Sequence, residues 1–347
     1  MLLPPLIGHE RVKTRLAGAH ASEKLPQALL LAGPRGVGKQ RLALWLAQLI
    51  HCEVPRGGSQ PEPCGECRSC RLVLSLQHPD VHWFVPFESS KRSSDVEKQA
   101  DAAAEALAEE MAARREQPLY APVVGLASHP VASIRLLLKR LALTPAMGKR
   151  KVFILGDAER LIPQLGTEVA ANALLKALEE PPADSVIILT AADPNALLPT
   201  ILSRVVLVRV ARIADSDVTA FVQQAVAIRE QPELEQRVTA AEGCIGKLFA
   251  TDAHRSGQID QAARFTDAPL LFALGQVPFQ ARGGFTEMLD ALASRLRSEA
   301  RRGGDTEKLV EAIALVLDAR DLAQGNVNPQ LLAAVLGEDL PGSRAAS

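Results

Sequence analysis

Aromatic residues are scarce in this chain: phenylalanine, tyrosine and tryptophan make up only 3% of its 347 residues. Its cores must therefore be built from leucine, valine, isoleucine and alanine, which favours helices and buried parallel strands over a β-sandwich. An excess of charge of one sign is lacking too, because the formal net charge is −1. No global basic field therefore draws the chain to nucleic acid, and any such contact has to be local or supplied by partners.

Long apolar runs are also absent. No stretch reaches the length of a membrane span, and residues 1–6 lack the basic start and apolar run of a secretory signal. We therefore expect a cytoplasmic protein without a membrane partner. A composition of 47% hydrophobic and 23% charged residues is that of a globular protein, and a length of 347 residues predicts two or three domains.

Cysteines are few, but four of the five lie close together: Cys52, Cys64, Cys67 and Cys70. The last three form two overlapping Cys-x-x-Cys pairs, which together with the first is the spacing of a tetrahedral thiolate site. Disulfides and a redox-active pair are the alternatives, and a reducing compartment disfavours disulfides. We predict a zinc ion with a structural role, because four thiolates leave no open coordination position. His51 or His78 could replace one cysteine as a ligand.

A glycine-rich segment follows the first apolar run, and its key residues are Gly33, Gly36, Gly38 and Lys39. A strand, a glycine loop and a helix in this order are the context of a phosphate-binding loop, whose lysine reaches the β and γ oxygens. The next position should be Ser or Thr to ligate magnesium, but it is Gln40, whose longer arm suits octahedral geometry poorly. We expect a degenerate nucleotide site with impaired use of ATP or ADP; the alternative is a glycine turn without a ligand.

The segment 172–204 carries the longest specific pattern. Leucines at helical spacing lead to Pro181-Pro182, where the helix must end because proline lacks an amide hydrogen. The apolar run 186–189 predicts a strand buried on both faces, and Ser203-Arg204 closes the segment. We expect this arginine just outside the carboxyl edge of the sheet, where it can contact a phosphate, its own or a neighbour's.

This segment resembles the clamp-loader branch of the AAA+ ATPases, in which an Ala-Leu-Leu-Lys-x-Leu-Glu-Glu-Pro-Pro helix precedes a Ser-Arg-Cys arginine finger; Val205 stands in place of the cysteine. Subunits of the γ/τ and δ′ kind in that family carry an inserted module similar to the four-cysteine segment. The resemblance implies that Arg204, next to Ser203, acts in trans on the ATP site of an adjacent γ/τ subunit. The alternative for Arg204 is an ion pair on the surface of its own chain.

Measured against the family pattern, catalytic groups are missing. The run 151–159 resembles a Walker B strand with Asp157 at the magnesium-supporting position, but Ala158 stands where a glutamate activates water. Glu159 is one residue off and should point elsewhere. A register shifted by one would put Gly156 and Asp157 at the two positions, and the acidic pair is broken in either register.

The sensor positions are weakened as well. The polar first sensor falls near Ala191-Ala192, with Thr190 one or two positions early, and Lys247 is either a second sensor or a surface lysine. We therefore predict that the protein has no ATPase activity of its own. An active enzyme with unusual residues is the alternative.

The resemblance covers essentially the whole chain and implies an α/β AAA+ P-loop domain with a zinc insert, followed by an all-α lid domain and an all-α collar domain. We assign these to 1–210, 211–264 and 265–347. A zinc module at about 52–70 and a charged, alanine-rich insertion at about 88–117 interrupt the first domain. We expect the insertion to be a solvated or partly disordered helix.

As the family implies, the protein is a stator in a hetero-oligomeric ring with γ/τ and δ subunits, which opens the sliding clamp and places it on primed DNA. Two other interpretations stay open: a γ/τ-type ATPase motor, and a zinc-bearing module that binds duplex DNA directly. The lost catalytic groups disfavour the motor. The near-zero net charge and the lack of interleaved aromatic and basic residues disfavour the DNA-binding module.

Overall fold

The computed structural model describes residues 3–4, 6–58, 60–87, 96–118, 127–161, 169–226 and 231–249, and in the C-terminal part residues 289, 292–293, 295–297, 299–300, 306–324, 332, 335–336 and 340. The chain divides into two compact units. The first comprises Met1–Pro122 with Ala127–Phe249, and the second comprises Val123–Leu126 with Ala250–Ser347.

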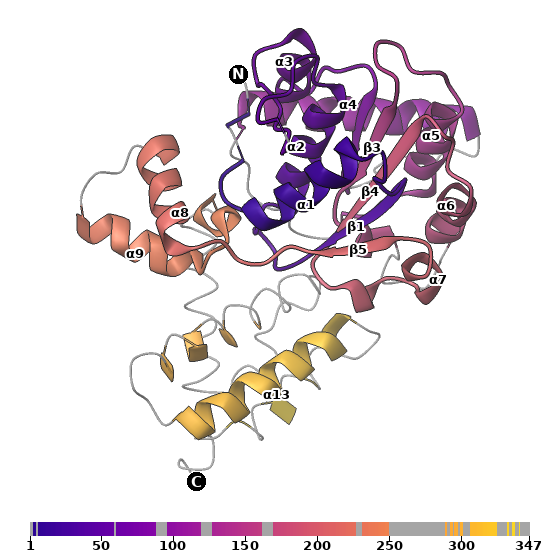
Figure 1. The fold of residues 1–347 in the computed structure, drawn as a ribbon. Helices are drawn as coiled ribbons and strands as arrows, with labels where there is room; N and C mark the ends of the chain where they lie inside the picture. Colours follow the sequence, from indigo (N-terminus) through magenta and orange to yellow (C-terminus); the bar gives the residue numbers. More distant parts are fainter. Residues whose placement is uncertain are drawn as a thin grey trace. The chain divides into compact units, whose positions relative to one another are not determined.

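A five-stranded parallel sheet forms the centre of the first unit (Figure 1). Its strands, in the spatial order β2-β3-β4-β1-β5, are β1 (Ala28–Ala32), β2 (Val81–Phe84), β3 (Lys151–Leu155), β4 (Ser185–Ala191) and β5 (Val206–Arg209). The three inner strands are buried along their whole length, as their uninterrupted apolar runs predict. The α/β fold class is therefore confirmed, and the loops that follow β1, β3 and β4 meet at one carboxyl edge.

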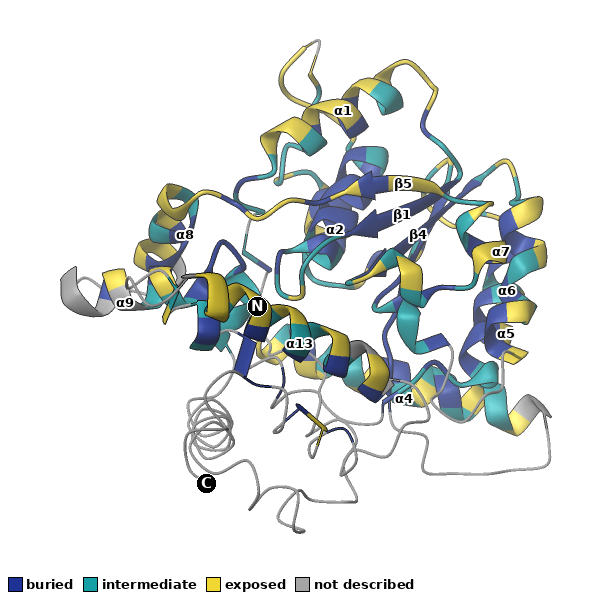
Figure 2. Cartoon of the chain, turned by 90° about the horizontal axis from the view of Figure 1, so that it is seen from below, coloured by how far each residue is buried: buried dark blue, intermediate teal, exposed yellow. Residues whose placement is uncertain are grey.

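Helices cover both faces of this sheet, with α1 and α2 on one face and α5 and α6 on the other (Figure 1). Their bounds are α1 (Glu10–Ala21), α2 (Lys39–His51), α3 (Arg68–Leu74), α4 (Val96–Glu116), α5 (Val131–Leu141), α6 (Val169–Glu179) and α7 (Pro199–Leu202), with short 3-10 turns η1 (Ala158–Leu161) and η2 (Pro194–Ala196). The predicted stop before Pro181-Pro182 is confirmed by the end of α6. Figure 2 shows β1 and β4 buried, whereas the edge strand β5 carries exposed residues.

The charged insertion forms the helix α4, but this helix is not solvated all round. Ala103 and Leu107 are buried against the core of the first unit. Arg114 is buried as well, with its guanidinium carbon 4.5 Å from the centroid of the Trp83 ring. The expectation of a solvated helix is therefore wrong for one face, because alanine-rich helices can bury a narrow apolar stripe among many charges.

After β5, every regular element among the described residues is helical. In the first unit the chain forms α8 (Asp215–Phe221), the π-helical turn η3 (Val222–Val226), α9 (Gln231–Ala241) and the 3-10 turn η4 (Ile245–Phe249). These elements share their own apolar cluster, which includes Val218, Phe221 and Leu248. Residues 250–264 of the predicted lid lie outside the described residues.

The described part of the second unit contains the helix α13 (Thr306–Gln324). Leu292, Ala312 and Val316 belong to an apolar cluster of this unit. Residues 265–288, 325–331 and 341–347 of the predicted collar domain lie outside the described residues. Within those that are described, no helix combines the length and apolar character needed to cross a lipid bilayer.

Candidate functional site

The glycine loop lies between β1 and α2 at the carboxyl edge of the sheet, with the local geometry that the sequence predicts. Gly36 and Gly38 have φ angles of 76° and 102°, in the left-handed region that glycine adopts without strain. A Cβ on Gly33 would lie 2.1 Å from the carbonyl oxygen of Val210, so the chain after β5 also requires glycine here. The three glycines thus set the path of the loop.

Lys39 turns back onto the loop that precedes it. Its Nζ donates to the carbonyl oxygens of Gly33, at 2.7 Å, and Pro34, at 3.0 Å, and the residue is buried. Burial lowers the pKa of Lys39, and nearby Asp157 and Glu159 partly oppose this effect. The charge of the lysine is thus satisfied by carbonyl oxygens of its own loop.

Gln40 occupies the position of the magnesium-ligating hydroxyl, and its amide lies against the end of β3. A Cβ on Gly156 would come within 2.7 Å of Gln40 Nε2, so this glycine leaves the space that the amide fills. The buried Oε1 of Gln40 has no hydrogen-bond partner among the residues that the structure describes. A long-armed amide and a single carboxylate at Asp157 make a poor donor set for octahedral magnesium.

The turn after β3 is set by a residue in the left-handed region. Asp157 has a φ of 51°, and its N–H donates to Thr190 Oγ1 at 3.0 Å. This left-handed residue redirects the chain, so Glu159 points back to the end of β4, where its Oε1 accepts the N–H of Ala192 at 3.1 Å. Burial and the nearby Asp157 raise the pKa of Glu159. The Glu159 carboxylate is thus engaged by the backbone of Ala192, and Ala158 is a buried core residue.

The turn η4 packs directly on the glycine loop. Gly246 N–H donates to the carbonyl oxygen of Gly36 at 2.8 Å. A Cβ on Gly246 would lie 2.6 Å from Gly36 Cα, so only glycine allows this approach. Sequence reasoning missed this contact, although two glycines three positions apart, Gly243 and Gly246, were visible as a signal.

Lys247 forms an ion pair within its own segment. Its Nζ lies 2.5 Å from Oε2 of Glu242, and Nη1 of Arg212 lies 3.4 Å from the same oxygen. The Glu242 carboxylate is buried between these two cations. Lys247 is therefore half-exposed and paired within its own segment. This arrangement resembles that of a surface lysine more than that of a second sensor.

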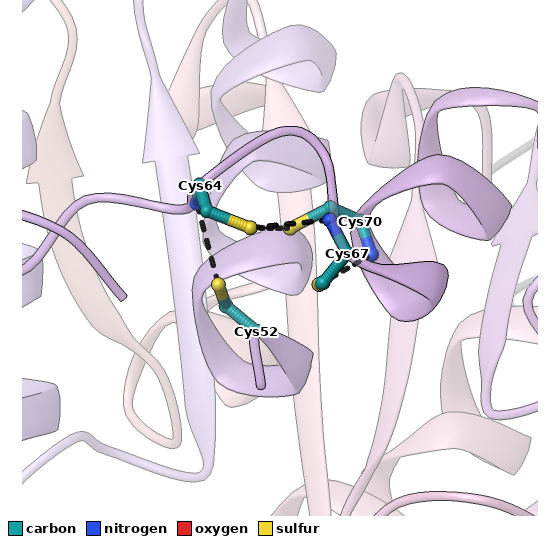
Figure 3. Close-up of side chains that lie close together, drawn as sticks. All are labelled: Cys52, Cys64, Cys67 and Cys70. Carbon is teal, nitrogen blue, oxygen red and sulfur yellow. Dashed lines mark hydrogen bonds between the residues drawn. The ribbon is translucent and has the colours of Figure 1, made fainter. Parts of the chain in front are cut away.

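The four cysteines predicted as metal ligands come together in space (Figure 3). Their Sγ atoms, from Cys52, Cys64, Cys67 and Cys70, all lie within 4.8 Å of one another. Each of three sulfurs accepts a backbone N–H: Cys52 from Cys64, Cys64 from Cys67 and Cys67 from Cys70, at 3.3 to 3.4 Å. The donated N–H of Cys67, together with that of Glu66, lowers the pKa of the Cys64 thiol to about 6. Four convergent sulfurs held by backbone donors can bind a metal ion.

The two histidines considered as replacement ligands lie apart from this cluster. His51 and His78 stack on each other, with ring centroids 4.2 Å apart. Burial lowers the pKa of His51 to about 4 and also lowers that of His78. Within the described residues, the only group of three or more potential ligands that gathers is that of the four cysteines.

Arg204 lies on the surface and makes an ion pair within its own chain. Its Nη2 and Nε lie 2.5 and 2.8 Å from Oε1 of Glu179, and its Nη1 donates to the carbonyl oxygen of Thr200. Ser203 Oγ donates to the same carbonyl at 3.1 Å and also receives a hydrogen bond from Arg204. The alternative of a surface ion pair is thus realised in the single chain.

The edge at which Arg204 lies also differs from the expectation. Val206 pairs with Leu29, and the loop begins at Gly33, roughly 13 Å further along β1 at about 3.3 Å per residue. Arg204 precedes Val206 and contacts the end of α6, so it lies at the amino edge of the sheet. The prediction of the carboxyl edge is wrong because β5 runs parallel to β1, and Arg204 therefore lies far from its own glycine loop.

Comparison with known proteins gives a consistent family match. The family model described as "DNA polymerase III, delta subunit" matches residues 8–214. DNA polymerase III subunit delta′ of Pseudomonas aeruginosa is 35% identical over 180 residues, which cover 52% of this chain and 41% of that protein. DNA polymerase III subunit tau of Salmonella typhimurium is 27% identical over 348 aligned positions, which cover 96% of this chain and 45% of that protein. The chain thus spans less than half the length of these curated relatives.

Among solved structures, a DNA polymerase III gamma subunit-related protein from Thermotoga maritima is similar at 17% sequence identity with a TM-score of 0.42. The alignment covers 96% of this chain and 99% of that one. A TM-score of this size is too low to support an argument about the site.

Proposed function

This chain belongs to the clamp-loader AAA+ family, as a member of the group described as DNA polymerase III, delta subunit, and on this premise we propose that it is a stator of the δ′ kind without ATPase activity of its own. The observation that carries the proposal is that the glycine loop is occupied by contacts with its own chain. Lys39 is bound to loop carbonyls, Gln40 fills the space beside Gly156, and Gly246 packs on Gly36. A loop with these contacts supports the nucleotide-binding fold without turning over nucleotide.

The chemistry at the end of β3 supports the same proposal. The residue after Asp157 is the buried Ala158, which has no group to polarise water. Glu159 does not replace it, because one oxygen of its carboxylate accepts the N–H of Ala192. Loss of a positioned general base removes roughly 10²- to 10⁴-fold in rate, so little hydrolysis is expected from this chain alone.

We further propose that Arg204 acts in trans, on the ATP site of an adjacent γ/τ-type subunit. Its place at the amino edge of the sheet supports this, because the arginine lies away from its own loop and on the surface. The pair with Glu179 is half-exposed, and such pairs contribute only about 0–1 kcal/mol. An arginine finger contributes roughly 10³- to 10⁵-fold to the rate, on the order of 4 to 7 kcal/mol, so exchanging Glu179 for a phosphate oxygen is favourable.

Zinc is the metal that we propose for Cys52, Cys64, Cys67 and Cys70. Four thiolates around one ion close its tetrahedral shell, which suits a structural site. When bound, the ion would tie the end of α2 to the first turn of α3. The four cysteines that would ligate it lie at the end of α2, before α3 and within α3.

The partners proposed are γ/τ-type and δ-type subunits in a hetero-oligomeric ring, with the sliding clamp and primed DNA reached through that complex. We propose that the helical segments at 211–264 and 265–347 serve as lid and collar domains, the collar joining the ring. The relatives named delta′ and tau support this assembly by homology.

A γ/τ-type ATPase is the second candidate, because the tau relative aligns over 96% of this chain. Single-turnover hydrolysis of ATP by the purified chain, measured with and without magnesium, separates the two functions. We expect no hydrolysis above a Lys39→Ala control, together with assembly of the wild-type chain into a ring with γ/τ-type and δ-type subunits. Magnesium-dependent turnover that Lys39→Ala abolishes would instead establish the motor.

A further inference from the structure

A cavity of about 230 Å³ lies beside the outer edge of β2, under the insertion helix α4. Leu44 of α2, Val73 of α3, and Leu107 and Met111 of α4 give it apolar walls. β2 itself contributes consecutive residues, including His82, because it is an outer strand of the sheet and faces the cavity along its edge. The proposed clamp-loader function uses neither this cavity nor α4.

Two arginines line the same cavity, Arg115 of α4 and Arg140 of α5. Neither forms an ion pair with any residue that the structure describes. Arg140 is half-buried, and this burial alone lowers its pKa. Its guanidinium carbon lies 5.9 Å from the ring centroid of Phe84, which is a weak compensation for lost hydration. Within the described part of the chain, the cavity therefore carries positive charge without a counter-charge.

The other polar groups of the cavity do not supply that counter-charge. The nearby Asp80 carboxylate is engaged by the backbone N–H groups of the segment 146–148. Burial lowers the pKa of His82 to about 4 and also lowers that of His78, so both rings are neutral near pH 7. The arginines are thus the charged groups of the lining, among apolar and neutral polar walls.

We propose that this cavity binds a small amphipathic anion: an apolar body lies against Leu107 and Met111, and a carboxylate or phosphate head is held by Arg115 and Arg140. Guanidinium groups bind both kinds of oxyanion with paired hydrogen bonds, which fits the unpaired arginines. The volume lies below the ~300–1,000 Å³ of sites for drug-sized ligands, which limits the apolar body to a short chain or a single ring. The insertion helix α4 would then form one wall of a ligand-binding site.

Isothermal titration calorimetry on the full chain tests this with four probes of equal chain length: octanoate, octyl phosphate, octanol and octylammonium. We expect octanoate, octyl phosphate or both to bind at least tenfold more tightly than octanol, and octylammonium not to bind. The stronger of the first two identifies the head group. Arg140→Gln should weaken anion binding by about tenfold or more, the range for a hydrogen bond between charged groups.

Matched variants separate the cavity from the general surface. Arg135→Gln removes an exposed arginine from the same helix α5, and it should leave the affinity unchanged. Ala108→Trp adds bulk at the cavity, whereas Ala113→Trp adds it at an exposed position of α4 outside the lining, so only Ala108→Trp should block binding. Arg115→Gln repeats the charge test if thermal unfolding shows that Arg140→Gln is misfolded. Equal binding of octanol and octanoate, equal effects within either matched pair, or no heat from any probe at millimolar concentration would overturn the proposal.

Discussion

At the scale of single residues, the surface position of Arg204 matters more than its present partner. The guanidinium binds Glu179 and the Thr200 carbonyl, yet it stays half-exposed at the amino edge of the sheet. An exposed pair of this kind breaks at small cost when a more highly charged partner is offered. The contact with Glu179 is therefore compatible with a resting position for an arginine that serves a neighbouring subunit.

Arg204→Ala should lower hydrolysis at the one adjoining ATP site by roughly 10³-fold or more, because the charge that stabilises the transferring phosphoryl group is lost. The total DNA-dependent ATPase rate of the reconstituted complex should fall by the fraction that this one site contributes. The rate of clamp loading should fall as well. Ring assembly, followed by gel filtration, should not change.

Arg209→Ala is the matched control, since Arg209 is an exposed arginine on the adjacent strand β5. It should leave both activities intact. Unchanged ATPase in the Arg204→Ala complex would remove the basis for action in trans.

A second residue-scale prediction concerns His129, which is buried at 1% exposure and donates from Nε2 to the carbonyl oxygen of Gly156 at 2.7 Å. Burial lowers its pKa to about 4, against about 6.5 in the unfolded chain. The unfolded state therefore binds more protons between these values, and stability should be lost as the pH falls from about 6.5 toward 4. His129→Gln should reduce this slope in melting temperatures recorded by circular dichroism, and an identical slope would exclude His129 as a contributor.

At the scale of elements, the four-cysteine module is held mainly by polar contacts and its thiols. Beside the mutual N–H to sulfur bonds, these include a β-bridge between Arg56 and Glu62, hydrogen bonds from Ser69 to Glu53 and an ion pair between Lys13 and Glu62. The central sheet has a separate, extensive apolar core. Metal binding should therefore order this module without deciding whether the sheet folds.

Purified protein should contain one zinc ion per chain, measured by atomic emission. Cys64→Ser should abolish zinc binding, because the remaining three thiols leave the tetrahedral set incomplete. We expect faster proteolysis confined to about 52–70, while far-ultraviolet circular dichroism keeps the signal of the α/β core.

Cys244→Ala serves as the control, since Cys244 is a free cysteine buried away from the cluster. Its zinc content should match the wild type. Full zinc content in Cys64→Ser would contradict the proposed ligand set.

At the scale of the whole molecule, the glycine loop connects two parts of the first unit. The hydrogen bond from Gly246 to Gly36 ties η4 to the loop, and Lys247 is paired with Glu242 instead of reaching over the loop. The hydrogen-bonding groups of the loop, Lys39 and the Gly36 carbonyl, are thus bonded to the chain itself. We expect such a protein to act as a fixed subunit of an assembly. Its neighbours would then supply the ATP sites, while this chain contributes a surface with an available arginine.

The sequence by itself was sufficient for features that depend on neighbours along the chain. The end of α6 before Pro181-Pro182, the buried inner strands, the glycine loop and the gathering of four cysteines all follow from local pattern. Each depends on backbone geometry or side-chain spacing over a few residues, and local chemistry determines these directly.

Only the tertiary structure decided where distant residues meet. The parallel direction of β5 moved Arg204 to the amino edge, and the left-handed Asp157 turned Glu159 toward Ala192. The buried face of α4, with its cavity and two unpaired arginines, depends on packing against β2 and α5. These outcomes follow from strand direction, one backbone angle and contacts between residues far apart in the chain, none of which a local pattern specifies.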